Sequence, residues 1–295
     1  MKEMYEFRIW DEYYHLLPVP NSAKFNGMVY VLRISRNDPL FQKIRVLDRE
    51  IRTPGGVGFF GYWDVSRSYT KKELAEAKLF HLNIVSAFEP TGEECGTIYD
   101  ENAACEICGA NRKQIGSLKL KKGSIPKKDI ARTIAGEVVV SEKFAAAVKK
   151  HGLKGVSLES VLFEGKIANY FQLAASSPEL DLSEKTVAGH NVFDLSSETS
   201  EEQEFTVSGG YKVKVEKTLF RCPKGHLIGS NLISEPYVKI TDALSKYDFF
   251  MSKQKVGAKQ GLLRPEPVYF CSPDFRKMVL EEKLTGFVFE IAHID

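Results

Sequence analysis

Residues 141–161 read Ser-Glu-Lys-Phe-Ala-Ala-Ala-Val-Lys-Lys-His-Gly-Leu-Lys-Gly-Val-Ser-Leu-Glu-Ser-Val, and residues 272–292 follow the same pattern. The second stretch reads Ser-Pro-Asp-Phe-Arg-Lys-Met-Val-Leu-Glu-Glu-Lys-Leu-Thr-Gly-Phe-Val-Phe-Glu-Ile-Ala. Aligned without a gap, the two stretches have identical residues at six positions: Ser141 and Ser272, Phe144 and Phe275, Val148 and Val279, Leu153 and Leu284, Gly155 and Gly286, and Glu159 and Glu290. We interpret them as two copies of an internal repeat.

Each copy predicts a helix between two strands. The serine at its start is a preferred N-cap residue. Phe144 and Val148 lie four positions apart, which places them on one face of a helix. Apolar residues from Val156 to Val161 then read as a strand, and the run Val138–Val140 supplies a strand before the helix. Because such helices pack on a sheet, the sequence predicts an α+β fold of two related half-domains, each ending in a strand–helix–strand unit.

Two short motifs have the residue types and spacing of metal ligands. Cys105 and Cys108 are two residues apart and are followed by Gly109, and Cys222 precedes His226 with three residues between them. Two thiolates at this spacing can bind one tetrahedral ion, and a cysteine with a histidine can complete its coordination. The sequence therefore predicts a structural Zn²⁺ site of three thiolates and one imidazole. Since more than a hundred residues separate the pairs, the ion would clamp two distant parts of the chain.

The two ligand pairs follow the division into halves, because each pair precedes one copy of the repeat. We therefore expect one zinc knuckle in each half, with the two turns meeting at a single bridging ion. The expected boundaries are an N-terminal half over 1–173, an acidic polar linker or loop over 174–204, and a C-terminal half over 205–295. The linker is rich in Ser, Glu, Asp and Thr, which indicates a solvated loop, and a partner-binding surface is the alternative.

Two further cysteines need separate interpretations. Cys95 lies ten residues before Cys105, and it is either a ligand in place of Cys222 or His226 or a small buried apolar residue. Cys271 follows the apolar run Val268–Phe270, so we expect it to be a thiol packed in the core.

The composition is that of a globular protein without extreme charge. Hydrophobic residues make up 43% of the 295 residues and charged residues 27%, as in chains that fold around an apolar core. The net charge of +2 leaves no global field that would attract nucleic acid or a membrane. No stretch is apolar over a bilayer-spanning length, and the charged start Met1–Glu6 is unlike a secretory signal. Five cysteines, an odd number, indicate free or metal-bound thiols, so we expect a cytoplasmic protein.

A cluster of lysines lies close to the first cysteine pair, within residues 119–128. In a zinc protein such a cluster is typical of nucleic-acid binding, which makes a zinc-containing nucleic-acid-binding protein the alternative function. Aromatic residues that would stack on bases are missing from the cluster, so nucleic-acid binding is the weaker of the two interpretations. Catalytic motifs such as Gly-x-Ser-x-Gly, His-Glu-x-x-His and a Walker loop are also missing. The sequence therefore favours a protein that is not an enzyme.

The motif Cys105-Glu106-Ile107-Cys108-Gly109, preceded by Gly96-Thr97-x-Tyr99-Asp100, resembles the bacterial double-CxxCG-motif proteins, as does the stretch from Val139 to Phe144 with the later Leu-x-Gly. That group is associated with immunity to polymorphic toxins. This chain departs from the pattern in its second knuckle, where His226 replaces a cysteine. The resemblance implies that Cys222 and His226 form the second ligand pair. It also implies a non-enzymatic protein that binds a cognate toxin and blocks it.

Overall fold

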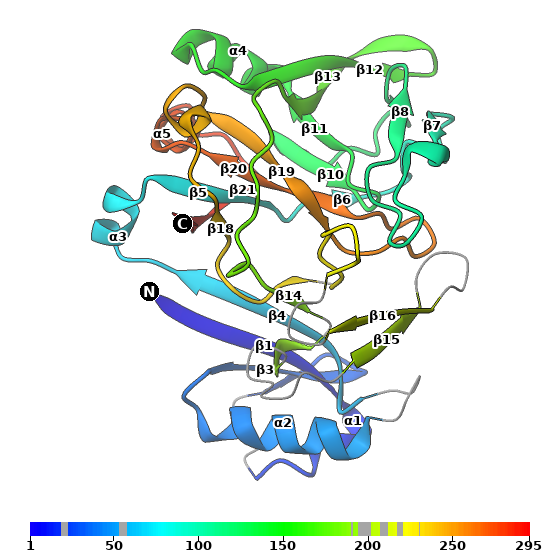
Figure 1. Ribbon diagram of the computed structural model, residues 1–295, viewed down its shortest axis with the longest axis vertical. Helices are drawn as coiled ribbons and strands as arrows, with labels where there is room; N and C mark the ends of the chain where they lie inside the picture. Colours follow the sequence, from blue (N-terminus) through cyan, green and yellow to red (C-terminus); the bar gives the residue numbers. More distant parts are fainter. Residues whose placement is uncertain are drawn as a thin grey trace. The chain divides into compact units, whose positions relative to one another are not determined.

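The structure, a computed structural model, describes residues 1–18, 23–52, 58–189, 191–193, 202–206, 212–216, 221–229 and 231–295. These residues form a mixed α+β fold, mostly of sheets and with five α-helices, in agreement with the predicted class (Figure 1). Within the described parts of the chain, no helix is long and apolar enough to cross a membrane. The chain divides into two compact units. Unit 1 comprises Met1–Ala75 with Asn191–Ser197, and unit 2 comprises Glu76–His190 with Glu198–Asp295.

Unit 1 is built on an antiparallel sheet with the strand order β2, β3, β1, β4. Its strands are β1 (Lys2–Trp10), β2 (Lys24–Phe25), β3 (Val29–Ser35) and β4 (Phe60–Ser68), and its helices are α1 (Asp11–Tyr14) and α2 (Pro39–Ile51). The start of α2 is fixed by Asp38, whose carboxylate accepts the Leu40 N–H, and by Pro39 in the first turn. The helix buries Phe41, Ile44 and Leu47 at three-residue spacing, so one apolar face lies in the core of the unit.

A short segment from far along the chain completes the core of unit 1. Phe193 is buried, and its ring centroid lies 5.8 Å from that of Phe7, 5.0 Å from that of Phe41 and 6.3 Å from that of Phe60. These rings come from two strands and a helix, so the segment fills the space between them. Aromatic clusters of this kind are among the largest contributors to a core.

Beside these rings, the same segment satisfies a buried carboxylate. Asn191 donates its Nδ2 to the Oδ2 of Asp48 at 2.7 Å. Asp48 also accepts the Phe59 N–H at 3.1 Å and two N–H groups of Arg52. A buried carboxylate is stable only when it is paired and hydrogen-bonded, so Asn191 contributes to the stability of α2 as well as to the segment's attachment.

These contacts correct the prediction that 174–204 is an acidic polar linker. Leu180 and Leu182 within that range are buried in unit 2, and Val192 and Phe193 are buried in unit 1. The few apolar residues of this stretch determine where it packs, although most of its residues are polar. The serine- and glutamate-rich part over 194–201 lies outside the described residues.

Unit 2 contains two larger sheets. The first has the order β6, β10, β11, β13, β12, β9, and the second has the order β18, β21, β5, β20, β19. The first consists of β6 (Ala87–Phe88), β9 (Lys119–Leu120), β10 (Ile130–Thr133), β11 (Val138–Ser141), β12 (Val156–Phe163) and β13 (Lys166–Ala175). The second consists of β5 (Leu79–Ile84), β18 (Tyr237–Val238), β19 (Phe249–Val256), β20 (Glu266–Cys271) and β21 (Phe287–Ile294). Helix α3 (Lys71–Glu76) crosses the boundary between the units, with residues 71–75 in unit 1 and Glu76 in unit 2. The remaining elements of unit 2 are the helices α4 (Glu142–His151) and α5 (Pro273–Glu281), the 3₁₀ helices η1 (Glu101–Ala103) and η4 (Asp242–Ser245), and three strand pairs: β7 (Ile98–Asp100) with β8 (Lys113–Ile115), β14 (Ala188–Gly189) with β17 (Asn231–Leu232), and β15 (Glu202–Thr206) with β16 (Lys212–Glu216).

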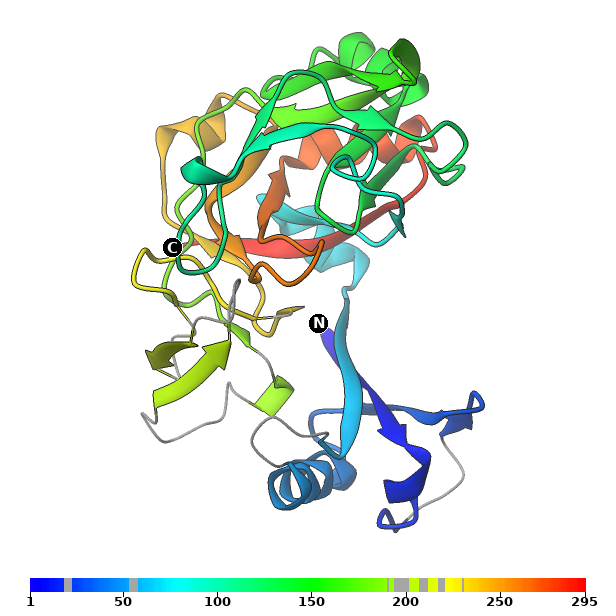
Figure 2. The same ribbon diagram turned by 90° about the vertical axis from the view of Figure 1, so that its right-hand side faces the viewer.

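The second sheet explains why the units differ from the predicted halves over 1–173 and 205–295. Strand β5 is hydrogen-bonded on one side to β20 and on the other to β21, both antiparallel. An early strand therefore lies between two of the last strands, as the cyan strand among orange and red strands shows (Figures 1 and 2). Pairing between strands so far apart in sequence leaves no local signal, so a boundary drawn from composition misses it.

The two predicted strand–helix–strand segments are present as β11–α4–β12 and β20–α5–β21. In each, one antiparallel strand lies between the flanking pair, β13 in the first and β5 in the second. Ser141 and Ser272 cap their helices by accepting the N–H of Phe144 at 3.2 Å and of Phe275 at 3.1 Å. The two helices contact each other through Phe144 and Phe275, whose ring centroids are 5.9 Å apart. The origin of both segments in one duplicated unit stays a prediction.

Steric constraints explain why both copies of the repeat have glycine at the position of Gly155 and Gly286, and they predict the effect of Gly286→Ala. Gly286 has φ +94°, and an added Cβ would lie 2.5 Å from the Ile130 carbonyl oxygen. Gly165, in the turn between β12 and β13, has φ +80° and no heavy atom within 4 Å of such a Cβ. Both alanines cost about 1–2 kcal/mol from the left-handed backbone, and only Gly286→Ala adds a clash of about 1–3 kcal/mol. Urea unfolding should therefore show the larger loss for Gly286→Ala, and equal losses would contradict this assignment.

Candidate metal centre

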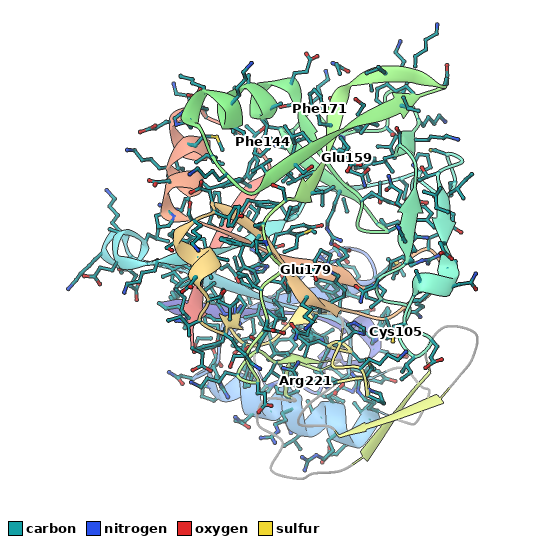
Figure 3. All side chains as sticks on the ribbon, turned by 45° about the horizontal axis from the view of Figure 1, so that its top comes forward. Cys105, Phe144, Glu159, Phe171, Glu179 and Arg221 are labelled. Carbon is teal, nitrogen blue, oxygen red and sulfur yellow. The ribbon has the colours of Figure 1, made fainter. Side chains whose placement is uncertain are left out.

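The first cysteine pair lies in a tight turn after η1, where Figure 3 labels Cys105. The Cys105 N–H donates to the Ala110 carbonyl at 2.6 Å, and the Gly109 N–H donates to the Cys105 carbonyl at 2.8 Å. Gly109 has φ +78°, a conformation that glycine adopts at least cost. The turn directs the N–H groups of Ile107 and Cys108 at the Cys105 sulfur and the N–H of Ala110 at the Cys108 sulfur.

The second pair forms a similar turn from Cys222 to His226. The Cys222 N–H donates to the His226 carbonyl at 2.8 Å, and the Gly225 N–H donates to the Cys222 carbonyl at 2.7 Å. Gly225 has φ +85°, so glycine is again favoured where the turn reverses. The N–H groups of Lys224 and His226 are directed at the Cys222 sulfur.

The end of β19 and the residues after it hold both turns. The Lys259 N–H donates to the Cys108 carbonyl at 2.8 Å. On the other turn, the Leu227 N–H donates to the Lys255 carbonyl and the Gly257 N–H donates to the Leu227 carbonyl, each at 2.9 Å. One strand and its exit therefore position two motifs that are distant in sequence.

The structure brings together the four residues that the sequence predicts as ligands, Cys105, Cys108, Cys222 and His226. The Cys108 and Cys222 sulfurs are 4.0 Å apart, and each lies 3.4 Å from His226 Nδ1. All four ligand atoms lie within 4.8 Å of one another, and all four side chains are buried. Four donors at such separations can all bind one central ion.

Cys95 is not a member of this group, which leaves the interpretation of Cys95 as a substitute ligand unsupported. Cys95 is half-buried, and burial raises the pKa of its thiol. Cys271 is fully buried in β20, and burial raises the pKa of its thiol well above the ordinary value. Cys271 is a core thiol, as the sequence predicts.

Hydrogen bonding within the group stabilises negative charge on sulfur. The contact with Cys108 lowers the pKa of Cys222 to about 4, with His226 and backbone N–H groups acting in the same direction against burial. The same contact, together with burial, raises the pKa of Cys108 far above its ordinary value. The two sulfurs are therefore coupled through one hydrogen bond. Metal ions bind thiolates and displace thiol protons, so the arrangement suits cation binding.

Hydrogen bonds within the group also shift the pKa values of Cys105 and His226. Burial raises the pKa of Cys105, but the backbone N–H groups of Cys108 and Ile107 and the contact with His226 outweigh it and leave the pKa lowered. The hydrogen bond to Cys222 raises the pKa of His226. A thiolate stabilises the positive charge of a protonated imidazole, which explains the direction of this shift.

Asn111 is a neighbour of the site that the sequence did not predict. Its Nδ2 lies 3.1 Å from His226 Nε2, the ring nitrogen other than the one near the sulfurs. Asn111 is exposed and has φ +67°. Asparagine is common in turns because it tolerates this backbone conformation. An asparagine shortly after the Cys-x-x-Cys-Gly motif is therefore expected from the turn alone, and nothing in the local sequence identifies it as a contact of the histidine.

The residues before the first pair have structural roles beside the site. Tyr99 donates its hydroxyl to Glu137 at 2.6 Å, and the Arg112 guanidinium lies 3.7 Å above the Tyr99 ring. Arg112, whose side chain is buried, also pairs with Glu93 at 2.8 Å. Asp100 caps η1 by accepting the Asn102 N–H at 2.9 Å. These contacts brace the turn that presents the cysteines.

An ion pair joins the two turns at the surface. Lys224 Nζ lies 3.3 Å from the Glu106 carboxylate, and this contact raises the pKa of Lys224, with the thiolates of Cys105 and Cys222 adding to the effect. Exposed pairs of this kind contribute little to stability, and because the pair is neutral overall it adds no net charge beside the sulfurs.

No protein-family model matches the chain, and no curated protein is significantly similar to it.

Proposed function

We propose that the chain is a non-enzymatic binding protein stabilised by a structural Zn²⁺ ion that Cys105, Cys108, Cys222 and His226 bind. The supporting observation is the set of separations among the Cys108, Cys222 and His226 ligand atoms, with the Cys105 sulfur within 4.8 Å of each of them. Zinc binds sulfur at about 2.3 Å and nitrogen at about 2.0–2.1 Å in a tetrahedron. These bond lengths place two sulfurs about 3.8 Å apart and a sulfur and a nitrogen about 3.6 Å apart. The 4.0 Å and 3.4 Å separations here are close to both values.

The proposed role of the ion is to join residues 105–108 to residues 222–226. Four protein donors fill a tetrahedral site, whereas catalytic zinc keeps one position for water or substrate. Three thiolates, a neutral imidazole and Zn²⁺ carry a net charge of −1, and Lys224, which is itself paired with Glu106, lies near enough to be stabilised by the thiolates. Since metal binding free energy in such sites adds to folding free energy, the ion would stabilise the surface built on both turns.

For this surface we propose a protein partner, a bacterial toxin that the chain neutralises in the cytoplasm. The support is the resemblance of the first knuckle and of the stretch from Val139 to Phe144 to proteins of toxin immunity. Immunity proteins act by binding and need no reactive group, which agrees with a closed metal site.

The test is to express the products of genes adjacent to this one, singly and together with this chain. A product that stops growth, that co-purifies with the chain and that loses its toxicity in the chain's presence would support the proposal. Toxicity that is unchanged by the chain would contradict it. A chain carrying a substitution at an exposed residue outside the ligand group, Lys166→Ala, serves as the folded control.

A zinc-containing nucleic-acid-binding protein is the second candidate, favoured by the exposure of Lys121, Lys122, Lys127 and Lys128. Binding through these lysines would weaken steeply with added salt, because each phosphate contact releases counterions. The test is retention on heparin and on a labelled oligonucleotide at low salt. Retention that is lost in the double variant Lys121→Glu, Lys122→Glu would favour this function over the first.

A further inference from the structure

The side chain of Asn111 contacts Nε2 of His226, the ring nitrogen that faces away from the cysteine sulfurs. His226 Nδ1 lies 3.4 Å from two sulfurs, and Nε2 lies 3.1 Å from the Asn111 amide. An imidazole that binds a metal through Nδ1 uses the lone pair of that atom, so its proton must be on Nε2. A protonated Nε2 requires a hydrogen-bond acceptor.

We propose that Asn111 is a positioning residue of the metal centre, and this inference rests on the proposed zinc site. With the ion bound, the Asn111 Oδ1 accepts the Nε2–H of His226 and holds the ring in the tautomer whose Nδ1 is free to bind. In the structure the Asn111 Nδ2 faces Nε2 at 3.1 Å, the arrangement that suits the other tautomer, in which Nε2 accepts. A half-turn of the amide exchanges its oxygen and nitrogen, so one side chain serves both tautomers.

The backbone of Asn111 allows the contribution of its side chain to be measured by itself. With φ +67°, the position suits asparagine, aspartate and glycine. Asn111→Gly removes the amide and leaves the backbone unstrained. Asn111→Asp keeps an acceptor of the same length that needs no rotation, and carboxylates are frequent partners of metal-binding histidines.

The experiment compares zinc affinity in the full-length protein and both variants by competition with a chromophoric chelator. Loss of such a partner weakens metal binding by about 10–100-fold, and we expect a weakening of this size for Asn111→Gly. We expect Asn111→Asp to bind within a few-fold of the original chain. Nitrogen-15 NMR of the zinc-loaded proteins should show a His226 Nε2–H that exchanges slowly with water in the original chain and in Asn111→Asp, and rapidly in Asn111→Gly.

Two results would overturn the inference while leaving the zinc site in place. One is an Asn111→Gly variant with unchanged affinity and a slowly exchanging Nε2–H. The other is an Asn111→Asp variant as weak as Asn111→Gly, since an acceptor should rescue binding. If the original chain takes up no zinc, the proposed site fails and the inference fails with it.

Discussion

Replacing Cys108 with alanine is expected to remove zinc from the protein and to loosen a turn more than a hundred residues away in sequence. Cys108 is fully buried, and its sulfur contacts both Cys222 and His226. Its loss leaves three ligands, and we expect the affinity for zinc to fall at least about 1,000-fold, equivalent to about 4 kcal/mol. Because the ion would connect the two turns, amide hydrogen exchange should become faster at residues 222–229 as well as at 105–110.

Cys271→Ala is the matched control for this change. Cys271 is also a fully buried thiol, but it lies outside the ligand group. Its replacement should cost packing free energy and leave one zinc ion per chain. Faster exchange in Cys108→Ala that is confined to residues 105–110 would contradict a connection through the ion.

Replacing Phe193 with alanine is expected to unfold unit 1 at much lower denaturant concentration. The Phe193 ring is surrounded by Phe7, Phe41 and Phe60, and truncating a buried phenylalanine costs about 3–5 kcal/mol. Both tryptophans of the chain, Trp10 and Trp63, belong to unit 1. Their fluorescence therefore follows unfolding of this unit specifically.

Phe25→Ala provides the control in the same unit. Phe25 is 52% exposed, so its removal should shift the transition by less than about 1 kcal/mol. Zinc content should be unchanged in both variants, since the ligands belong to unit 2. A Phe193→Ala transition that coincides with that of Phe25→Ala would show that residues 191–193 are dispensable for unit 1.

Features set by neighbouring residues could be predicted from the sequence. The caps at Ser141 and Ser272, and the strand–helix–strand segments that they begin, depend on contacts within a few positions. The four residues of the candidate site were also predictable, because closely spaced cysteines and histidine in glycine-containing turns are typical of metal binding. The spacing within each pair does not determine whether the two pairs lie close together, and the structure shows that they do.

Features set by distant pairing could not be predicted. The place of β5 between β20 and β21 depends on strands about two hundred residues apart in sequence. The place of Phe193 in unit 1 depends on three rings that come from other parts of the chain. Residues 174–204 are polar on average, so composition predicts a solvated segment. Their location is determined by the few apolar residues among them, which an average does not show.

X-ray absorption at the zinc edge of the full-length protein, purified without a histidine tag, tests the central claim most directly. A structural ion bound by Cys105, Cys108, Cys222 and His226 predicts one zinc per chain, with three sulfurs at about 2.3 Å and one nitrogen at about 2.0–2.1 Å. Protein without zinc, or zinc surrounded by oxygen and nitrogen with fewer than three sulfurs, would contradict it.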